Sequence, residues 1–528
     1  MVNGEFLNLG SMNSEIKQIV IVGGGTAGWL TAAVLAAHFD TRSAFSIKLI
    51  ESPNIKTIGV GEGTWPTMAT TLRRIGLSEA QFISECDASF KQGSRFFNWS
   101  KGGGESYYHP FSLPLAYSDL NIVDHWLESG ATEPFDQFAT TQAGVCNHHL
   151  APKQANTPEY ANVVNYGYHL NAGKFANLLR SHSVNNLGVQ HISAEVTSVN
   201  ASEDGIIQSV SLDNGTEVKG DLFIDCTGFK RLLIGQHLGV PFKSHKDVLF
   251  NDRAIAFQVP YESPNAPINS TTHATAHNAG WIWDIGLPTR RGIGIVYSSK
   301  YGSEQQALDT IEAYIKQHMP HANFADLTPN KISIDPGHLE TFWKGNCLAV
   351  GLSAGFIDPL EATAMVLIEF SAKFLREHLP ALKSDLPVLA DKFNQRMGVH
   401  WSNIIDFIKL HYVLSERTDS DYWLQHREPS SIPESLQRSL AMWKNRAPWH
   451  ADVEVAESMF PPASYQFILY GMGFKTQSTL ATRRLADRER AHIAKLIKNK
   501  HTELQKLCQH LPTNRKLLHD IKQSWNNR

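Results

Sequence analysis

The sequence is poor in several features, and each scarcity excludes a class of protein. No run of eighteen apolar residues occurs, which argues against a membrane-spanning helix. The formal net charge of −3 leaves no excess of either sign, so neither nucleic acid nor a membrane surface is an expected partner. We therefore expect a soluble, cytoplasmic protein.

Cysteine is also scarce, with five residues in a chain of 528 and no CxxC pair. This pattern indicates reduced thiols, as in a cytoplasm, and not a disulfide framework or a zinc site. The stretch Cys146-Asn147-His148-His149 carries side chains that can bind metal, but no partner cluster occurs elsewhere in the sequence. We expect these to be ordinary loop residues, and we expect no metal.

The composition and length are typical of a large globular enzyme. Apolar residues make up 42% of the chain and charged residues 19%, which is typical of a globular protein. The length exceeds what one hydrophobic core usually supports, so two or three lobes are expected. Residues 1–14 have neither a basic nor an apolar stretch, so they predict a disordered leader and no signal peptide.

The first ordered segments predict a βαβ unit. Residues 17–25, KQIVIVGGG, read as a buried strand that ends in glycines, and residues 26–38 are alanine-rich with helical spacing. Residues 46–52, SIKLIES, read as a second strand. This opening predicts an α/β fold with a Rossmann-like nucleotide-binding sheet.

Three later segments extend this unit. Residues 220–229 and 346–356 each read as a strand that runs into a loop of small residues, and residues 362–378 read as a helix.

The expected domain organisation has two parts. Residues 15–378 form a nucleotide-binding module, with a substrate lobe inserted at about 98–165 and 245–330. Residues 379–528 form a second, mainly helical substrate lobe.

The glycines of the first turn carry a nucleotide-binding pattern. Gly23, Gly25 and Gly28 match GxGxxG between a strand and a helix, where backbone amides at the helix start approach a pyrophosphate. Glu51 closes the second strand, where a carboxylate binds ribose hydroxyls. A glycine-rich structural turn is the alternative, but strand, helix and acid in register favour a dinucleotide site.

Two further stretches bear on which dinucleotide is bound. GDLFIDCTGF and NCLAVGLSAGFIDP resemble the second and third nucleotide-contacting segments of flavoprotein monooxygenases. That resemblance implies FAD, not NAD. No second fingerprint for NAD(P)H occurs, so reduced flavin is expected to come from a separate reductase.

Lys91 stands in an unusually aromatic stretch, CDASFKQGSRFFNW. On spacing alone it reads as a lysine whose stem covers aromatic surface while its ammonium stays in water.

Two other local patterns have physical readings of their own. Trp281 and Trp283 are two residues apart, so on a strand they share one face, as core residues or as part of a site. The helix predicted at 362–378 opens at Glu361-Ala362-Thr363-Ala364, and the first free amides of such a helix start can bind an anion.

Five motifs occur in the order GGGTAGWLTA, IESPNIKTIGVGEGTWP, ASFKQGSRFFNW, GWIWDIGLP and FIDPLEATA. Together, over roughly residues 17 to 475, they resemble the flavin-dependent tryptophan halogenases. The resemblance implies that FADH2 and O2 convert chloride or bromide to hypohalous acid. Lys91 then relays the acid to an electron-rich aromatic ring.

The resemblance also assigns roles to individual positions. Lys91 matches the catalytic lysine and Glu361 its acidic partner. Thr363 and Ala364 match the halide-binding amides, although the family usually has glycine in place of Ala364. The tryptophan pair matches a wall between flavin and substrate, and here Gly286 replaces the proline of that motif. The positions matched to FAD contacts are Gly24, Ala27, Ser52, Ile55, Ile58, Val60, Gly63, Val196, Leu352 and Met365.

The substrate side departs from enzymes that take free tryptophan. His109 and Phe111 match substrate-contacting positions, but Phe460 stands where those enzymes have tryptophan, and Ser464 replaces an asparagine. No tyrosine pair is present to bind the amino acid group. Unpaired charges are costly to bury, so indole, an indole derivative or a larger tethered aromatic is expected in preference to free tryptophan.

Two other functions stay open at this point: a flavin-dependent aromatic hydroxylase and a flavin-binding paralogue without turnover. The sequence leaves open the natural substrate, the ring position, the preferred halide, the reductase and the oligomeric state, a homodimer included.

Overall fold

In the computed structural model, the chain is described over residues 14–42, 45–55, 61–452, 458–477 and 487–527. Two predicted cofactor positions, Ile58 and Val60, lie outside these residues, as do residues 1–13 of the predicted leader. No helix within the described part of the chain is long and apolar enough to cross a membrane.

The first sheet has six strands and confirms the predicted βαβ opening. Strand β1 (Gln18–Val22) is almost entirely buried and pairs in parallel with β2 (Ser46–Glu51) and β12 (Leu222–Asp225). The strand order is β20-β21-β12-β1-β2-β8, and only the edge strand β20 runs antiparallel to its neighbour. The remaining strands are β8 (Gln190–Ser193), β20 (Trp343–Lys344) and β21 (Cys347–Ala349).

Helix α2 (Thr26–Ala36) follows β1 and lies against both α8 (Ala172–Asn185) and α10 (Thr363–His378). A helix covered on several sides needs small side chains, which explains the alanine-rich sequence. The predictions of helices at 26–38 and 362–378 are confirmed to within two residues.

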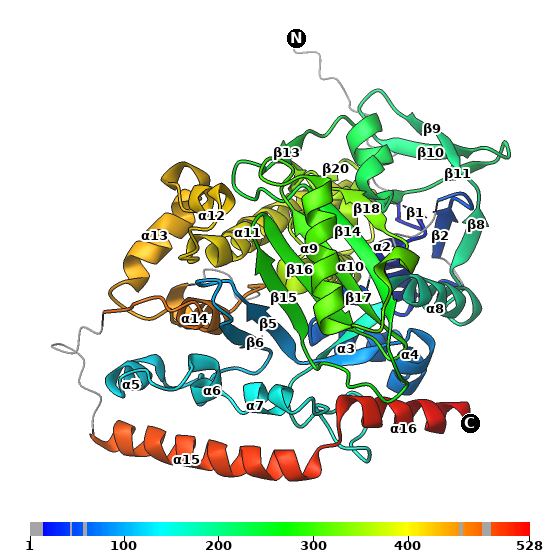
Figure 1. Cartoon of the computed structure of the whole chain (residues 1–528). Coiled ribbons are helices and arrows are strands. Elements are labelled where there is room, and N and C mark those ends of the chain that lie inside the picture. The colour runs from blue at the N-terminus through cyan, green and yellow to red at the C-terminus, as the bar shows by residue number, and fades with distance from the viewer. Residues whose placement is uncertain (1–13, 43–44, 56–60, 453–457, 478–486, 528) are drawn as a thin grey trace.

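A second sheet of seven strands has the order β18-β14-β17-β16-β15-β5-β6. Strand β5 (Gly93–Phe97) joins it by parallel pairing to β15 (Thr272–His277). Helix α9 (Glu304–His318) covers one face, as Figure 1 shows at its centre. The other strands are β6 (Ser106–Pro110), β14 (Arg253–Pro260), β16 (Gly280–Gly286), β17 (Arg290–Tyr297) and β18 (Asn330–Ser333).

A small antiparallel sheet brings two distant segments together. Its central strand β7 (Gly167–Asn171) pairs with β3 (Gly61–Gly63) on one side and β4 (Ser89–Lys91) on the other. Gly63 and Lys91 thereby come close together. A Cβ added to Gly63 would lie 3.0 Å from Nζ of Lys91.

The C-terminal part is mainly helical, as predicted. Helix α11 (Leu386–Val413) is 28 residues long, and α14 (Pro462–Gly471) and α15 (Asp487–His510) follow. Helix α16 (Asn514–Asn526) lies against α4 (Glu79–Glu85), as Figure 1 shows, and also contacts β4. The side-chain amide of Asn514 donates to the carbonyl of Phe90 at 3.1 Å. The domain boundaries given above stay predictions.

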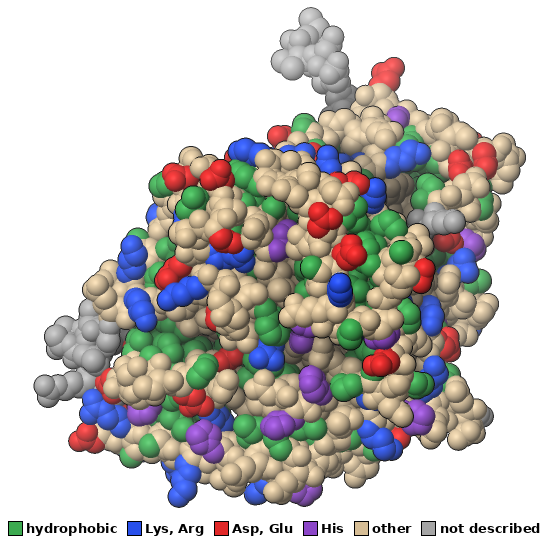
Figure 2. All heavy atoms as spheres, in the orientation of Figure 1, with side chains coloured by type: hydrophobic (Ala, Val, Ile, Leu, Met, Phe, Trp, Pro, Cys, Tyr) green, Lys and Arg blue, Asp and Glu red, His purple; other side chains and the backbone are tan. Residues whose placement is uncertain are grey.

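The surface in Figure 2 mixes basic and acidic side chains, with no broad area of one sign on the face shown. This agrees with the small net charge.

Candidate active site

One cavity of about 490 Å³ connects the glycine turn after β1 with Lys91 and Glu361. It therefore joins the predicted nucleotide site to the predicted catalytic pair. Its lining includes these predicted positions: Gly23, Gly24, Gly25, Ala27, Glu51, Ser52, Ile55, Gly63, Lys91, Val196, Trp281, Trp283, Leu352, Glu361, Thr363, Ala364 and Met365.

Four predicted positions, namely Gly28, His109, Phe111 and Phe460, are described but do not line this cavity. Gly28 has a packing explanation, because a Cβ there would lie 1.9 Å from the carbonyl oxygen of Gly23. The glycine lets helix α2 approach the end of β1 closely.

The nucleotide end fits a dinucleotide such as FAD. No described side chain caps the start of α2, so its first amides are free to bind a pyrophosphate. Glu51 ends β2 beside Gly24, where an added Cβ would lie 2.2 Å from the carboxyl carbon. The glycine thus makes room for a carboxylate that can bind a ribose.

Gly24→Ala is therefore expected to weaken FAD binding, because the new methyl group displaces the Glu51 carboxylate. A lost hydrogen bond to a charged group corresponds to a fall in affinity of about ten- to a hundredfold. Quenching of flavin fluorescence measures this affinity. Gly398→Ala, in α11 with open space around it, is the control and should bind FAD like the parent chain. Equal affinities for both variants would contradict the ribose role of Glu51.

The tryptophan pair lies on one face of β16, as its spacing predicts. The two ring centroids are 6.3 Å apart, and both side chains line the cavity. Trp281 Nε1 donates to Asp358 at 2.9 Å, and the Tyr412 hydroxyl of α11 also donates to this buried carboxylate. Trp283 Nε1 is buried with no hydrogen-bond partner among the described residues. Sequence reasoning assigned no role to Asp358 or Tyr412.

Lys91 is 1% exposed, so a lysine that extends its ammonium into water is the wrong reading. Its Nζ lies 5.3 Å from the centroid of the Phe111 ring and forms no hydrogen bond to any described residue. Burial lowers the pKa of Lys91 to about 8, although the nearby Glu361 charge acts in the opposite direction. Both the amine and the ammonium forms are thus accessible near neutral pH.

Glu361 is held in an unusual backbone conformation at the start of α10. Its φ of 69° and that of Ala362, 56°, are both left-handed, which costs free energy for residues other than glycine. Trp65 Nε1 donates to the Glu361 carbonyl at 2.8 Å. The strained turn directs the side chain inward, where it is 5% exposed.

Two histidines contact the same carboxylate oxygen, Oε1 of Glu361. His109 Nδ1 lies at 2.8 Å and His411 Nε2 at 3.2 Å. Burial alone would raise the pKa of Glu361, but the charges and hydrogen bonds of these histidines hold it well below its usual range. His411 was not found from the sequence, because a histidine within a long amphipathic helix carries no signal of its partner.

Of the predicted substrate residues, His109 contacts this carboxylate directly and links it to Ser464. His109 Nε2 contacts the Ser464 hydroxyl at 2.9 Å. Phe460 is 2% exposed and stacks on Phe407 with centroids 3.7 Å apart. The Trp65 ring packs edge-on against the Phe460 ring, with centroids 4.9 Å apart. Trp65 is the more exposed of the two residues.

A mostly parallel sheet whose glycine turn and terminal acid line a cavity is typical of a dinucleotide-binding enzyme. The chain belongs to the tryptophan halogenase family, whose model matches residues 18–487. The family is that of flavin-dependent halogenases, so the predicted resemblance, fold class and enzyme class are confirmed.

Individual relatives agree over nearly the whole chain. Tryptophan 6-halogenase SttH of Streptomyces toxytricini is 35% identical over 477 residues, 86% of this chain and 89% of that protein. The structure of a tryptophan halogenase from Shewanella frigidimarina is 45% identical with a TM-score of 0.93, covering 97% of this chain and 99% of the other. BrvH, a flavin-dependent halogenase from Brevundimonas, is 33% identical with a TM-score of 0.83, over 96% and 99%.

Proposed function

We propose that this halogenase binds reduced FAD in the cavity and a chloride or bromide ion at the start of α10. The halogen is then transferred to an indole-type aromatic beyond Lys91 and Glu361. The observation that carries the proposal is the cavity that joins a nucleotide-binding turn to a buried lysine beside a buried carboxylate. As in other members of this family, a separate reductase supplies the reduced flavin.

Reduced flavin, when bound, would supply two of the four electrons that reduce O2, and the halide the other two, in the overall reaction FADH2 + O2 + X⁻ + H⁺ → FAD + HOX + H2O. The chain's part begins with the halide. Thr363 and Ala364 line the cavity at the first turn of α10, and no described side chain caps that turn. Their amides and the positive end of a 16-residue helix favour an anion there.

Trp281 and Trp283 then keep the aromatic substrate away from the flavin. Lys91 receives the hypohalous acid, either as a hydrogen-bond donor in its ammonium form or as an amine that forms a chloramine. A π-electron pair of the aromatic ring forms the new carbon–halogen bond, and the bond from the halogen to hydroxide, or to the lysine amine, breaks. Glu361 stabilises the cationic ring until its proton leaves, so that ArH + HOX give ArX + H2O.

The substrate is argued from the groups that surround Glu361. Ser464 is already engaged with His109, and the Phe460 ring is covered by Phe407, so neither is placed to bind an amino acid group. The relatives SttH and RebH are named tryptophan 6-halogenase and tryptophan 7-halogenase. We propose an indole or an indole derivative without a free amino acid group for this chain.

The test supplies the enzyme with a flavin reductase, NADH, FAD, O2 and bromide, together with a panel of indole, free tryptophan, a tryptophan-containing peptide and phenol. Mass spectrometry should show the two-line bromine pattern on an indole-type compound, and much less on free tryptophan. Hydroxylated product, independent of bromide, would favour a monooxygenase instead. Oxygen consumption without any product from the panel would favour a flavin protein without turnover.

A further inference from the structure

His411 of α11 touches the proposed catalytic carboxylate without lining the cavity. It is fully buried, and both ring nitrogens have a partner. Nδ1 lies 2.9 Å from the carbonyl oxygen of Phe407, and Nε2 lies 3.2 Å from Oε1 of Glu361.

The identity of these partners determines where the protons are. A carbonyl oxygen only accepts, so Nδ1 of His411 must carry a hydrogen. Nε2 faces a carboxylate oxygen, and a lone pair on each atom would repel the other. One proton therefore lies between them, in addition to the one on Nδ1.

That proton belongs on His411 and not on Glu361. An imidazole is ordinarily more basic than a carboxylate by about two pKa units. In addition, His109 Nδ1 donates to the same oxygen at 2.8 Å, which further stabilises the ionised carboxylate. His109 needs no charge for this, because its Nε2 can accept from the Ser464 hydroxyl at 2.9 Å.

We propose that His411 is a positioning residue that carries a proton as an imidazolium and so keeps Glu361 ionised for halogen transfer. This inference rests on the proposed function, in which the Glu361 carboxylate stabilises the cationic ring. With both histidines bound to Oε1, the other carboxylate oxygen, Oε2, is left to face the substrate.

Aromatic rings enclose His411. The centroids of the Phe96, Phe407 and Trp99 rings lie 5.1, 5.2 and 6.0 Å from that of the imidazole ring. The titratable groups around the pair are His109 and Tyr107 of β6 and Lys91 of β4. Burial raises the pKa of Tyr107 well above its usual value, so it stays neutral.

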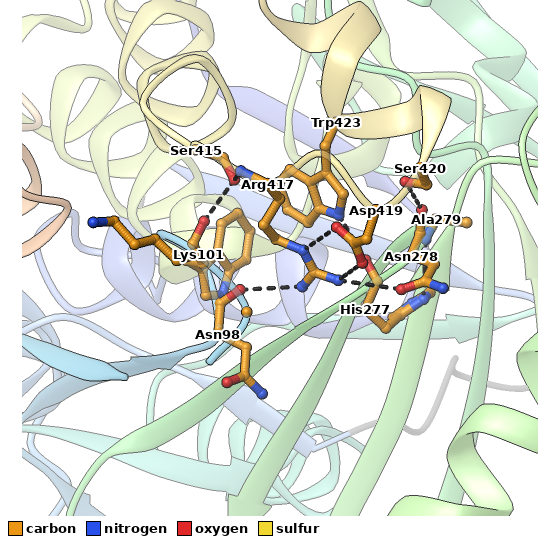
Figure 3. A network of polar contacts seen from close by, with 12 residues as sticks. Asn98, Lys101, His277, Asn278, Ala279, Ser415, Arg417, Asp419, Ser420 and Trp423 are labelled. Atoms are coloured by element: carbon orange, nitrogen blue, oxygen red, sulfur yellow. Dashed lines mark hydrogen bonds and ion pairs between the residues drawn. The ribbon is translucent and has the colours of Figure 1, made fainter. Parts of the chain in front are cut away.

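The end of α11 is anchored, which fixes the position of His411. Figure 3 shows the buried guanidinium of Arg417, which donates to the Asn98 carbonyl at 3.1 Å and to the Asn278 side chain at 3.2 Å. Asp419 accepts from the same guanidinium at 3.0 and 2.6 Å. The network ties the chain just after α11 to the segments that follow β5 and β15.

His411→Gln tests the proposal, because glutamine can donate a hydrogen bond but cannot carry the charge. Without the imidazolium, burial should raise the pKa of Glu361 into the assay range. The kcat of this variant should then fall as the pH is lowered, with an apparent pKa at least about one unit above that of the parent enzyme. The KM should change less than kcat.

Ser464→Ala is the matched control, since it removes a hydrogen bond from the other histidine without removing a charge. Its rate can differ, but the shape of its pH profile should match that of the parent enzyme. A His411→Gln profile that also keeps this shape would overturn the proposal.

A measurement on the unmodified enzyme separates this inference from the proposed function and does not depend on the folding of a variant. With ¹⁵N-labelled histidine, both nitrogens of His411 should resonate in the imidazolium range under the conditions of the halogenation assay. The signal is assigned by its loss in His411→Gln or, if that variant does not fold, by its coupling to neighbouring protons. A neutral-ring signal would refute the charged state, whereas failure to brominate any indole would refute only the proposed function.

Discussion

Replacing Lys91 with methionine is expected to abolish aromatic halogenation while reduced flavin continues to be oxidised. Methionine fills the buried space of the lysine stem, and the variant no longer carries the cost of a buried amine, so the fold should be kept. Without Nζ, nothing holds the hypohalous acid beside the substrate. Product formation should fall by about 10⁴-fold or more, the upper limit of ordinary general acid–base assistance.

Three quantities are measured for each variant: halogenated product by mass spectrometry, oxygen uptake, and hypohalous acid trapped in solution. The trapped acid should increase as product disappears. Lys300→Met is the control, because Lys300 is exposed and lies 4.9 Å from the Tyr301 ring centroid, the arrangement of an ordinary surface lysine. Halogenation by Lys91→Met at the parent rate would remove Lys91 from the reaction.

Glu361→Gln should have the second largest effect. Glutamine keeps an acceptor oxygen for His109 and His411, and its amide nitrogen takes the place of Oε2, so the geometry is retained and the charge is lost. A neutral amide cannot stabilise a cationic ring. The kcat is expected to fall by about 10²–10⁴-fold, with FAD affinity unchanged.

Glu369→Gln gives the comparison for Glu361→Gln. Glu369 is also buried in α10, and burial raises its pKa to about 7, but it binds Thr67 at 2.9 Å and Thr71 at 2.5 Å and does not line the cavity. Steady-state rates with one indole substrate should therefore drop only for Glu361→Gln. A similar drop in both variants would assign the effect to the stability of α10 and not to the chemistry.

Local sequence signals were sufficient for the elements that bear the nucleotide site. The strand of β1, the glycine turn, and the shared face of Trp281 and Trp283 each follow from spacing within a few residues. The assignment of Lys91, by contrast, depended on the family resemblance, because its local pattern describes an exposed lysine equally well.

The contacts that organise Glu361 could not be predicted in this way. His109 and His411 are 252 and 50 residues from Glu361 in the sequence. Trp281 and Tyr412 are likewise 77 and 54 residues from Asp358. A helical pattern predicts which face of α11 is buried, but not which groups it will meet there. The stacking of Phe460 on Phe407 also depends on the tertiary structure, and it changes a predicted substrate contact into a covered ring.

Helix α11 has a consequence for how this enzyme can be altered. Trp401 lines the cavity and His411 contacts Glu361, and these two residues are ten positions apart on α11, a span of about 15 Å. The helix fixes the spacing between the cavity wall at Trp401 and the contact of His411 with Glu361. A single residue inserted between them would rotate His411 by about 100° about the helix axis and turn it away from Glu361. To change the substrate preference, the loops around α11 should therefore be redesigned and the length of the helix kept.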